Sequence, residues 1–155
     1  MNFILHQEDL TIGDLEKSYE LITESSFHKS SSETHLWPEL FLGGYPLQDL
    51  VLDKSFIQKY IKTLEQINDF FKTSKKSGSI HLFGGLKYEL NNSDLPEKIY
   101  NSAYIGVPGK GVREVYRKRL LPNYDIFDEQ KYFSPGNKNG FIEIENKTFA
   151  IIICE

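Results

Sequence analysis

A regular amphipathic repeat between residues 53 and 71 limits the folds open to this chain more than any other feature of its sequence. Apolar side chains recur there every three or four positions, at Ile57, Tyr60, Ile61, Leu64, Ile67 and Phe71. This spacing predicts a helix with one buried face, which Asp53 can cap at its N-terminus and Gly78 can follow at its end. Such a helix needs a sheet or a second helix to cover its apolar face.

Short apolar runs lie on both sides of this helix. We expect strands, two of them in a hairpin, at residues 3–5, 35–40, 80–86, 100–107, 112–118, 141–144 and 149–154. Gly84 and Gly85 predict a bulge or bend inside the third of these strands. A further helix, capped by Thr11 or Asp14, is predicted from apolar residues at Leu15, Tyr19, Ile22 and Phe27. This order of elements is typical of a layered α/β domain.

Composition and charge narrow the class of protein. The 155 residues suit one domain, and 39% hydrophobic with 26% charged residues is typical of a globular protein. A net charge of -4 argues against a nucleic-acid binder, and no apolar stretch reaches the roughly 18 residues that would span a membrane. The N-terminus lacks the basic segment of a signal peptide. With Cys154 as the one cysteine, we expect a cytoplasmic protein with a free thiol.

Three side chains could carry chemistry, and each also has an ordinary structural explanation. Cys154 ends an isoleucine-rich run, where it can be a small buried apolar residue or a nucleophile at the C-terminal end of a strand. Glu39 can be a solvated loop carboxylate, or a general base among apolar neighbours. Lys118, between Arg117 and Arg119, can belong to a basic edge strand or can stabilise an oxyanion. The residues by themselves leave both explanations open.

Two other patterns predict no site. The glycine-rich segment 106–111 would need Gly at position 104 and Ser or Thr at position 111 to bind phosphate, but Tyr104 and Gly111 stand there. The four histidines are scattered along the chain and have no cysteine partners at the spacing of metal sites. We therefore expect no metal ligands in this chain.

The segments around the three candidate residues resemble those of the nitrilase superfamily. Residues 38–40 (Pro-Glu-Leu) with 44–46 (Gly-Tyr-Pro) resemble its base segment, and residues 116–118 (Tyr-Arg-Lys) with 121–122 (Leu-Pro) resemble its lysine segment. Residues 152–155 (Ile-Ile-Cys-Glu) resemble its nucleophile segment. The order Glu, Lys, Cys is that of the family, with Lys118 and Cys154 separated by 36 positions (154 − 118). The resemblance implies an α-β-β-α sandwich.

Further motifs narrow the resemblance to one subfamily. Residues 121–129 (Leu-Pro-Asn-Tyr-Asp-Ile-Phe-Asp-Glu) and 132–136 (Tyr-Phe-Ser-Pro-Gly) look like the glutaminase domain of glutamine-dependent NAD synthetases. Residues 11–15 and 45–50 are also similar to that subfamily. Two mild departures are Trp37, where Phe is more usual, and Gly43, where Thr is common.

This resemblance implies roles for six residues. Cys154 would be the nucleophile, Glu39 the general base and Lys118 the cation that stabilises the oxyanion, in covalent hydrolysis of the glutamine side-chain amide. Tyr124 and Glu129 would bind or orient glutamine. Phe127 would form a wall of the glutamine pocket.

The resemblance also implies that residues 1–155 are the first part of a carbon–nitrogen hydrolase domain. Because the sequence ends within the apolar run 150–154, we expect an incomplete sandwich that is truncated after the nucleophile strand and has little or no activity by itself. ATP and Mg²⁺ would serve an absent synthetase domain that accepts the ammonia, and the full-length protein is expected to be a homo-oligomer. Two alternatives stay open: a stand-alone nitrilase-type amidase or carbamoylase, or an inactive module that packs against a partner.

Overall fold

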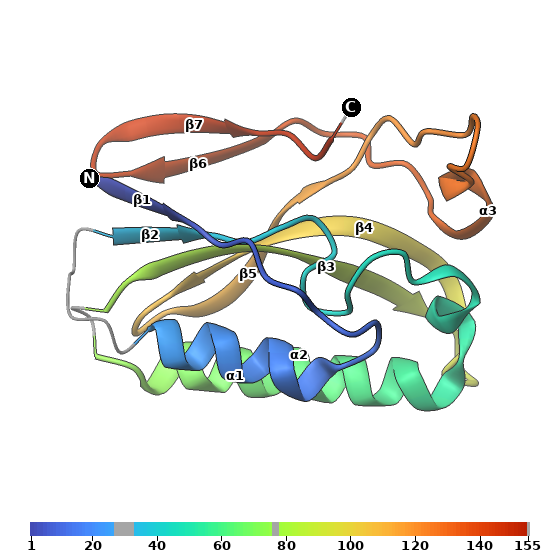
Figure 1. Ribbon diagram of the computed structural model, residues 1–155, viewed down its shortest axis with the longest axis horizontal. Coiled ribbons are helices and arrows are strands. Elements are labelled where there is room, and N and C mark those ends of the chain that lie inside the picture. The colour runs from blue at the N-terminus through green and yellow to red at the C-terminus, as the bar shows by residue number, and fades with distance from the viewer. Residues whose placement is uncertain (27–32, 76–77, 155) are drawn as a thin grey trace.

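The protein is built in layers, as Figure 1 shows: two helices, then a five-stranded sheet, then a two-stranded sheet. This arrangement comes from a computed structural model that describes residues 1–26, 33–75 and 78–154. The five-stranded sheet has the order β1-β2-β3-β4-β5, and the small sheet pairs β6 with β7. Strands β1, β2 and β3 run parallel, whereas β4 and β5 are antiparallel to their neighbours.

The elements follow the predicted order along the chain. The strands are β1 (Asn2–Leu5), β2 (Glu33–Leu36), β3 (Ile80–Leu90), β4 (Pro96–Val107), β5 (Gly111–Arg117), β6 (Gly140–Ile144) and β7 (Lys147–Ile151). The helices are α1 (Leu15–Ser25), η1 (Gln48–Leu52, a 3-10 helix), α2 (Lys54–Thr73) and α3 (Glu129–Tyr132). Within the described ranges, no helix is both long enough and apolar enough to cross a membrane.

The two long helices begin where their capping residues predict. The Asp14 carboxylate accepts a hydrogen bond from the Lys17 amide, so Asp14 rather than Thr11 caps α1. Asp53 caps α2 in the same way. The end of α2 differs from the prediction: the helix stops at Thr73, ahead of Gly78, because Ser74 is already extended. Phe27, which was expected on the apolar side of α1, lies outside the described residues.

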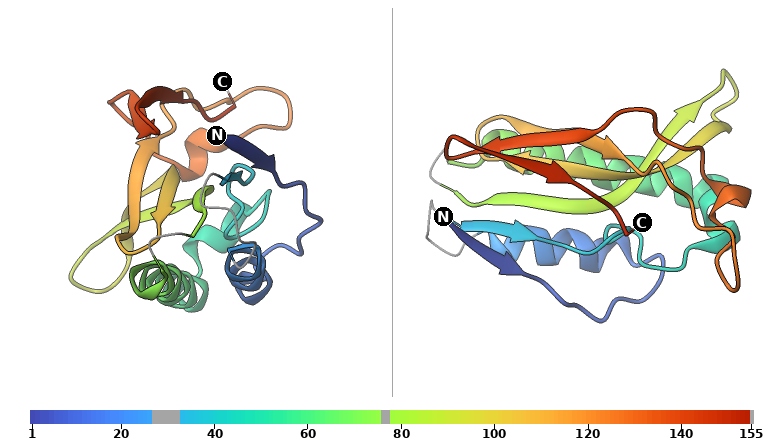
Figure 2. Two further views of the ribbon diagram at one scale, coloured as in Figure 1. Left: turned by 90° about the vertical axis from the view of Figure 1, so that its left-hand side faces the viewer. Right: turned by 90° about the horizontal axis from the view of Figure 1, so that it is seen from above.

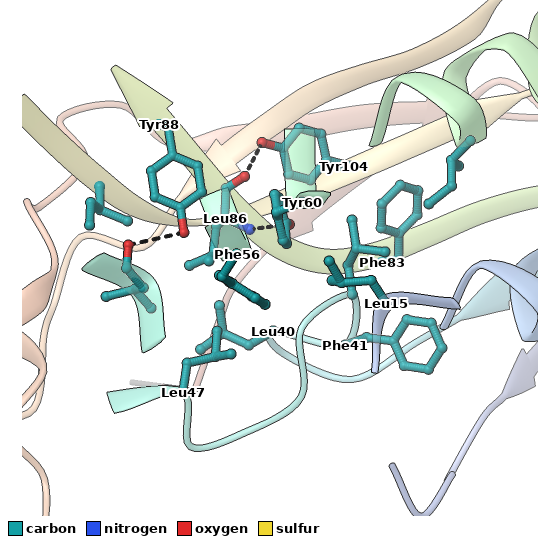
Figure 3. Packing of buried hydrophobic residues seen from close by; sticks show 14 of the residues in the cluster. Leu15, Leu40, Phe41, Leu47, Phe56, Tyr60, Phe83, Leu86, Tyr88 and Tyr104 are labelled. Carbon is teal, nitrogen blue, oxygen red and sulfur yellow. Dashed lines mark hydrogen bonds between the residues drawn. The ribbon is translucent and has the colours of Figure 1, made fainter. Parts of the chain in front are cut away.

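The main core fills the space between the helices and one face of the large sheet. Figure 3 shows how closely its aromatic and aliphatic side chains pack. The backbone of Leu86 on β3 is held from two sides, because the Tyr60 hydroxyl accepts from its N–H and the Tyr104 hydroxyl donates to its carbonyl oxygen. Tyr60 comes from α2 and Tyr104 from β4, so these bonds fix the helix against the centre of the sheet.

A second, smaller core joins the two sheets. Ile142 and Ile144 on β6 are buried against Ile105 on β4. Figure 2 shows the hairpin of β6 and β7 lying along the face of the large sheet that the helices leave open. The order of helices, sheet and sheet therefore confirms the first three layers of the sandwich that the sequence analysis expects.

The second predicted strand is shorter than expected, and its early end creates the turn that carries Glu39. The strand was predicted over 35–40, but β2 stops at Leu36, and Trp37 adds one last bond, from its N–H to the Leu82 carbonyl, at 2.9 Å. Pro38 has no N–H to continue the ladder, and Leu40 has a left-handed backbone with φ 52°. Residues 38–44 therefore fold into a turn above the sheet.

Gly84 makes room for this turn. A Cβ atom at position 84 would lie 2.4 Å from the Leu40 nitrogen and 2.5 Å from the Pro38 oxygen. At Gly85 a Cβ would meet the Tyr60 hydroxyl on the other face. The predicted bulge at these glycines is wrong: pairing with β4 is continuous there, and the register shifts only at Glu89 and Leu90. The glycines serve close approach on both faces of β3.

A chain of hydrogen bonds anchors the start of the same turn to α1. The Trp37 indole N–H donates to His81 Nδ1 at 3.1 Å. His81 must then carry its proton on Nε2, which lies 3.0 Å from the Ser26 hydroxyl oxygen. Ser26 donates in turn to the Ile22 carbonyl. The His6 ring stacks on the Trp37 ring, with 3.5 Å between ring centres, and covers its other side.

This chain of hydrogen bonds requires a neutral His81, which predicts a pH dependence of stability. Burial, helped by the positive charges that His35 and His6 can carry, lowers the pKa of His81 to about 2. The unfolded chain takes up this proton near pH 6.5, so the stabilisation is complete above pH 6.5 and is lost as the pH falls. Between pH 7 and pH 5, His81 should cost the folded protein about 2 kcal/mol of unfolding free energy.

The measurement compares wild-type protein with His81→Gln in urea unfolding at pH 7 and pH 5. Gln can still accept from Trp37 and donate to Ser26, but it does not titrate. We expect the variant to lose about 2 kcal/mol less than the wild type over this interval. An equal loss in both proteins would show that His81 is protonated in the folded state or contributes nothing to the pH dependence.

Candidate active site

Lys118 lies one residue beyond β5, where backbone contacts hold it on both sides. Its N–H donates to the Asn101 carbonyl on β4 at 2.8 Å, and its carbonyl accepts from the Gly136 N–H at 2.8 Å. Gly136 is needed for this approach, because a Cβ there would lie 2.4 Å from the Arg117 oxygen. The Lys118 backbone is thus fixed before its side chain makes any contact.

The Lys118 ammonium group lies between two carboxylates. Its Nζ donates to Glu39 Oε1 at 2.8 Å and to Glu129 Oε1 at 2.9 Å. The lysine side chain is 1% exposed and that of Glu129 7%, whereas that of Glu39 keeps 25% of its surface open. A buried lysine with two carboxylate partners stays charged, and Glu39 is the most exposed of the three groups.

Glu39 reaches this position from the turn after β2. The Pro38 carbonyl accepts from the Gly84 N–H, and Leu42 returns a bond to the Gly84 carbonyl, so the turn is tied to β3 at both ends. The Glu39 carboxylate also accepts a second bond on Oε1, from the Asn101 side-chain amide at 2.6 Å. Three segments distant in sequence therefore meet at this one carboxylate.

Glu129 approaches from the opposite side, as the first residue of α3. Its backbone N–H donates to the Pro122 carbonyl, and its carbonyl accepts from Phe133, which closes the short helix. One carboxylate oxygen, Oε1, binds Lys118, while the other, Oε2, is buried and accepts no hydrogen bond within the described part of the chain.

The charges of this cluster shift two pKa values. Burial lowers the pKa of Lys118, but its hydrogen bonds to Glu39 and Glu129 outweigh this effect, so the net shift is upward. Burial raises the pKa of Glu129, and the charge of Glu39 adds to that shift, although Lys118 opposes it. Lys118 is therefore the fixed positive charge of the cluster. Of the residues described, no group of three or more His, Cys, Asp and Glu could hold a metal ion.

Cys154 lies beyond the end of β7 rather than inside a strand. The strand predicted at 149–154 runs in fact from Lys147 to Ile151, and the thiol is exposed. Cys154 has a left-handed backbone with φ 51°, a conformation that extended pairing cannot include. The residue is therefore not the small buried side chain that the structural explanation of the sequence required.

Tyr45 lies within electrostatic range of Cys154 and of the lysine cluster, which consists of Lys118, Glu39 and Glu129. Burial raises the pKa of the Tyr45 phenol, and the negative charges of Glu129, Glu39 and Cys154 raise it further, against the opposing charge of Lys118. Tyr45 is about half exposed, in the loop that follows the Glu39 turn. The charges of Glu39, Lys118 and Cys154 all act on its phenol, so Tyr45 lies within electrostatic range of the three predicted catalytic residues.

Tyr124 and Phe127 form a separate pair beside the cluster. Their rings meet edge to face, with 5.7 Å between ring centres, and the Phe127 N–H donates to the Tyr124 carbonyl. Tyr124 lines a surface hollow of about 640 Å³ together with Arg119, Leu120, Leu121, Pro122, Asn123, Gln130, Phe133 and Pro135. Of the predicted binding residues, Glu129 contacts Lys118 directly.

The sequence analysis did not single out Asn101 or Tyr45 as site residues. The available signal for Asn101 was a polar side chain, next to Ser102, within the largely apolar run 99–107, which had to be buried once that run became a central strand. Tyr45 stood in the base segment, but nothing in its spacing showed that the loop returns to the cluster.

Comparison with known proteins gives a consistent set of relatives. The chain is 35% identical over 153 residues to the glutamine-dependent NAD(+) synthetase of Thermotoga maritima, and 32% identical over 157 residues to that of Aquifex aeolicus. These alignments cover 97% and 100% of the chain, which spans about a quarter of the length of either relative. The chain is also 29% identical to the 2-oxoglutaramate amidase of Bacillus subtilis, of which it covers 53%. No family model matches the chain.

Solved structures agree in fold. A glutamine-dependent NAD(+) synthetase from Acinetobacter baumannii superposes with a TM-score of 0.66 at 27% identity, over 92% of this chain and 25% of that one. The NitN amidase from Nesterenkonia superposes with a TM-score of 0.75 over 98% of this chain and 56% of that one, at 17% identity. Together, these similarities relate residues 1–155 to about a quarter of the length of glutamine-dependent NAD(+) synthetases, and the layered fold is shared with the amidase.

Proposed function

We propose that the full-length protein containing this chain hydrolyses the side-chain amide of glutamine and supplies the ammonia for ATP-dependent amidation of deamido-NAD to NAD. The observation that carries the proposal is the buried Lys118 ammonium, held between Glu39 and Glu129. A fixed cation beside a partly open carboxylate is what covalent amide hydrolysis needs next to a thiol. Relatives that match the whole chain are named for the glutamine-dependent reaction.

The first half of the reaction forms a thioester. Glu39 takes the proton from the Cys154 thiol, and the thiolate attacks the amide carbon of glutamine. The negative charge that develops on the amide oxygen is stabilised by Lys118, a contribution of about 3 kcal/mol for a well-placed donor. Glu39 then gives its proton to the leaving nitrogen, so the C–N bond breaks and ammonia departs.

The second half releases glutamate. Glu39 takes a proton from a water molecule, which attacks the thioester carbon, and Lys118 again faces the oxyanion. Collapse of this intermediate breaks the C–S bond and returns the proton to Cys154. The same carboxylate thus acts as base and acid in both halves, which requires one carboxylate oxygen that stays free to exchange protons.

The remaining predicted residues have assignments in this proposal. Tyr124 helps to bind glutamine, and Phe127 forms a wall of its pocket. Glu129 uses Oε1 to orient Lys118, and its second oxygen, which accepts no hydrogen bond in the described structure, can receive one from the ammonium group of glutamine.

The proposal extends to parts of the protein beyond this site. Residues 1–155 form the first part of the carbon–nitrogen hydrolase domain, and the synthetase domain that consumes the ammonia uses ATP and Mg²⁺. The thiol of Cys154 must stay reduced to act as a nucleophile, which favours a cytoplasmic location. We expect the full-length enzyme to be a homo-oligomer and the 155-residue chain by itself to hydrolyse little or no glutamine.

The direct test measures two products of the purified full-length protein. With glutamine, ATP and deamido-NAD, we expect glutamate and NAD to form together, and ammonia to replace glutamine as nitrogen donor. Asparagine, one methylene shorter, should be a poor substrate. Failure to hydrolyse glutamine, in a preparation that makes NAD from ammonia, would refute the proposed role of this site.

A second candidate function is a stand-alone amidase that acts on another small amide. The relative named 2-oxoglutaramate amidase, with 29% identity over 96% of the chain, favours it. Both functions use the same three catalytic residues, so the substrate distinguishes them. Hydrolysis of 2-oxoglutaramate in preference to glutamine, without NAD formation from either, would favour this alternative.

A further inference from the structure

Asn101 lies in the middle of β4 with its side chain 1% exposed, at the point where the two catalytic groups of the lysine cluster meet. Its Nδ2 donates to Glu39 Oε1 at 2.6 Å. The orientation of the amide is fixed by this contact, because only its NH₂ group can donate to a carboxylate. The Glu39 carboxylate therefore has one hydrogen-bond partner on the sheet and another, Lys118, beyond it.

The backbone of the same residue positions Lys118. The Asn101 carbonyl accepts from the Lys118 N–H at 2.8 Å, and the Lys118 Nζ then donates to Glu39 Oε1 at 2.8 Å. Asn101, Lys118 and Glu39 thus form a closed triangle of hydrogen bonds. A single residue of β4 fixes the base by its side chain and the cation by its backbone.

Both hydrogen bonds that Glu39 accepts in the described structure end on one oxygen. Asn101 and Lys118 share Oε1, which leaves Oε2 as the oxygen able to take up and release a proton. An oxygen that already accepts two donors, one of them charged, is the poorer proton acceptor of the pair.

The other end of the Asn101 amide argues against a purely structural role. Its Oδ1 is buried and accepts no hydrogen bond from the described residues. The large majority of buried side-chain polar atoms have a hydrogen-bond partner. The oxygen of the partly buried Asn68 has one, since its Oδ1 accepts the Val112 N–H at 2.9 Å. Among the described residues, the Asn101 side chain makes its hydrogen bond with Glu39.

We propose that Asn101 is a positioning residue, which holds Glu39 Oε1 beside Lys118 so that Oε2 alone exchanges the proton with Cys154 and the leaving ammonia. This inference rests on the proposed amide hydrolysis. Without the Asn101 amide, the Glu39 carboxylate can rotate and present either oxygen, so fewer substrate encounters find the base aligned.

The experiment uses full-length protein with Asn101→Leu, and with Asn101→Ala so that a packing defect specific to leucine does not decide the result. Asn68→Leu serves as the matched control, because it removes an asparagine whose Oδ1 accepts from the backbone of Val112 on β5. Glutamine hydrolysis is measured for kcat and KM across pH. NAD formation from ammonia is measured in each variant to confirm that the protein is folded.

For both Asn101 variants we expect kcat for glutamine to fall about 10- to 1000-fold, while KM changes less than threefold. The charged and titratable groups around Glu39 are Lys118, Glu129, Tyr45 and Cys154, and none of these is altered. Asn68→Leu should keep the wild-type kcat and pH profile.

Two outcomes would overturn the inference. If the wild type hydrolyses glutamine and both Asn101 variants keep its kcat and pH profile, Asn101 does not position the base, and the proposed function stands. If the wild type makes NAD from ammonia but hydrolyses no glutamine, the proposed function fails and the inference fails with it.

Discussion

Replacing Cys154 with alanine in the full-length protein is expected to lower glutamine hydrolysis by about 10⁴-fold or more. The thiolate forms the bond that splits amide hydrolysis into two easier steps, and alanine offers no atom that could form it. Cys154→Ala removes a single sulfur atom and keeps the backbone, so NAD formation from ammonia should show an intact fold.

Cys154→Ser is the second variant to compare with the wild type, and NAD formation from free ammonia is the control reaction. Serine keeps a nucleophilic atom but is far harder to deprotonate than a thiol, so its activity should lie much closer to alanine than to wild type. NAD formation from free ammonia should be unchanged in both variants. Substantial glutamine turnover by Cys154→Ala would remove Cys154 from the mechanism.

Lys118→Met should damage both the stability and the activity of the protein. The change leaves Glu39 and the buried Glu129 facing each other without their common cation. Removing one partner of a buried ion pair costs about 3–5 kcal/mol, and the loss of an oxyanion donor should lower kcat about 100- to 1000-fold. Urea unfolding and glutamine turnover measure the two effects separately.

The stability loss in Lys118→Met should depend on pH. Without the lysine, the raised pKa of Glu129 should rise further, since burial and Glu39 both favour its neutral form. The variant should therefore recover stability relative to wild type as the pH falls and Glu129 becomes protonated. Lys131→Met is the matched control: Lys131 is about half exposed and pairs with Asp49 at 3.3 Å, so its loss should cost far less stability than the loss of Lys118. Equal losses for both lysines would contradict the account.

The parts of the fold that follow local rules could be predicted from sequence. Asp53 caps α2, and every apolar position named in its repeat faces the main core. The errors lie where tertiary contacts override local pattern. The early end of β2 depends on how residues 38–44 cross Gly84, and β7 ends at Ile151, which pairs with Gly140 at the start of β6. Neither contact can be read from the residues that form β2 and β7.

In the candidate site, too, some residues could be predicted from the sequence and others could not. The family resemblance of the segments around Glu39 and Lys118 predicts both residues, and the structure brings their side chains within hydrogen-bond distance. Asn101 could not be assigned in this way, because its role comes from the pairing of β4 with β3 and β5 and from the turn above β3. Glu129 was expected to bind substrate, yet its contact with Lys118 depends on how α3 folds back over Pro122.

The measurement that tests the central claim most directly is covalent labelling of the full-length protein with a glutamine analogue that carries a diazoketone in place of the amide. Such an electrophile reacts with the nucleophile that would attack glutamine, and peptide mass spectrometry locates the adduct. The account predicts one adduct, on Cys154, whose formation glutamine prevents. An enzyme that hydrolyses glutamine but carries the adduct on another residue, with Cys154 unmodified, would contradict it.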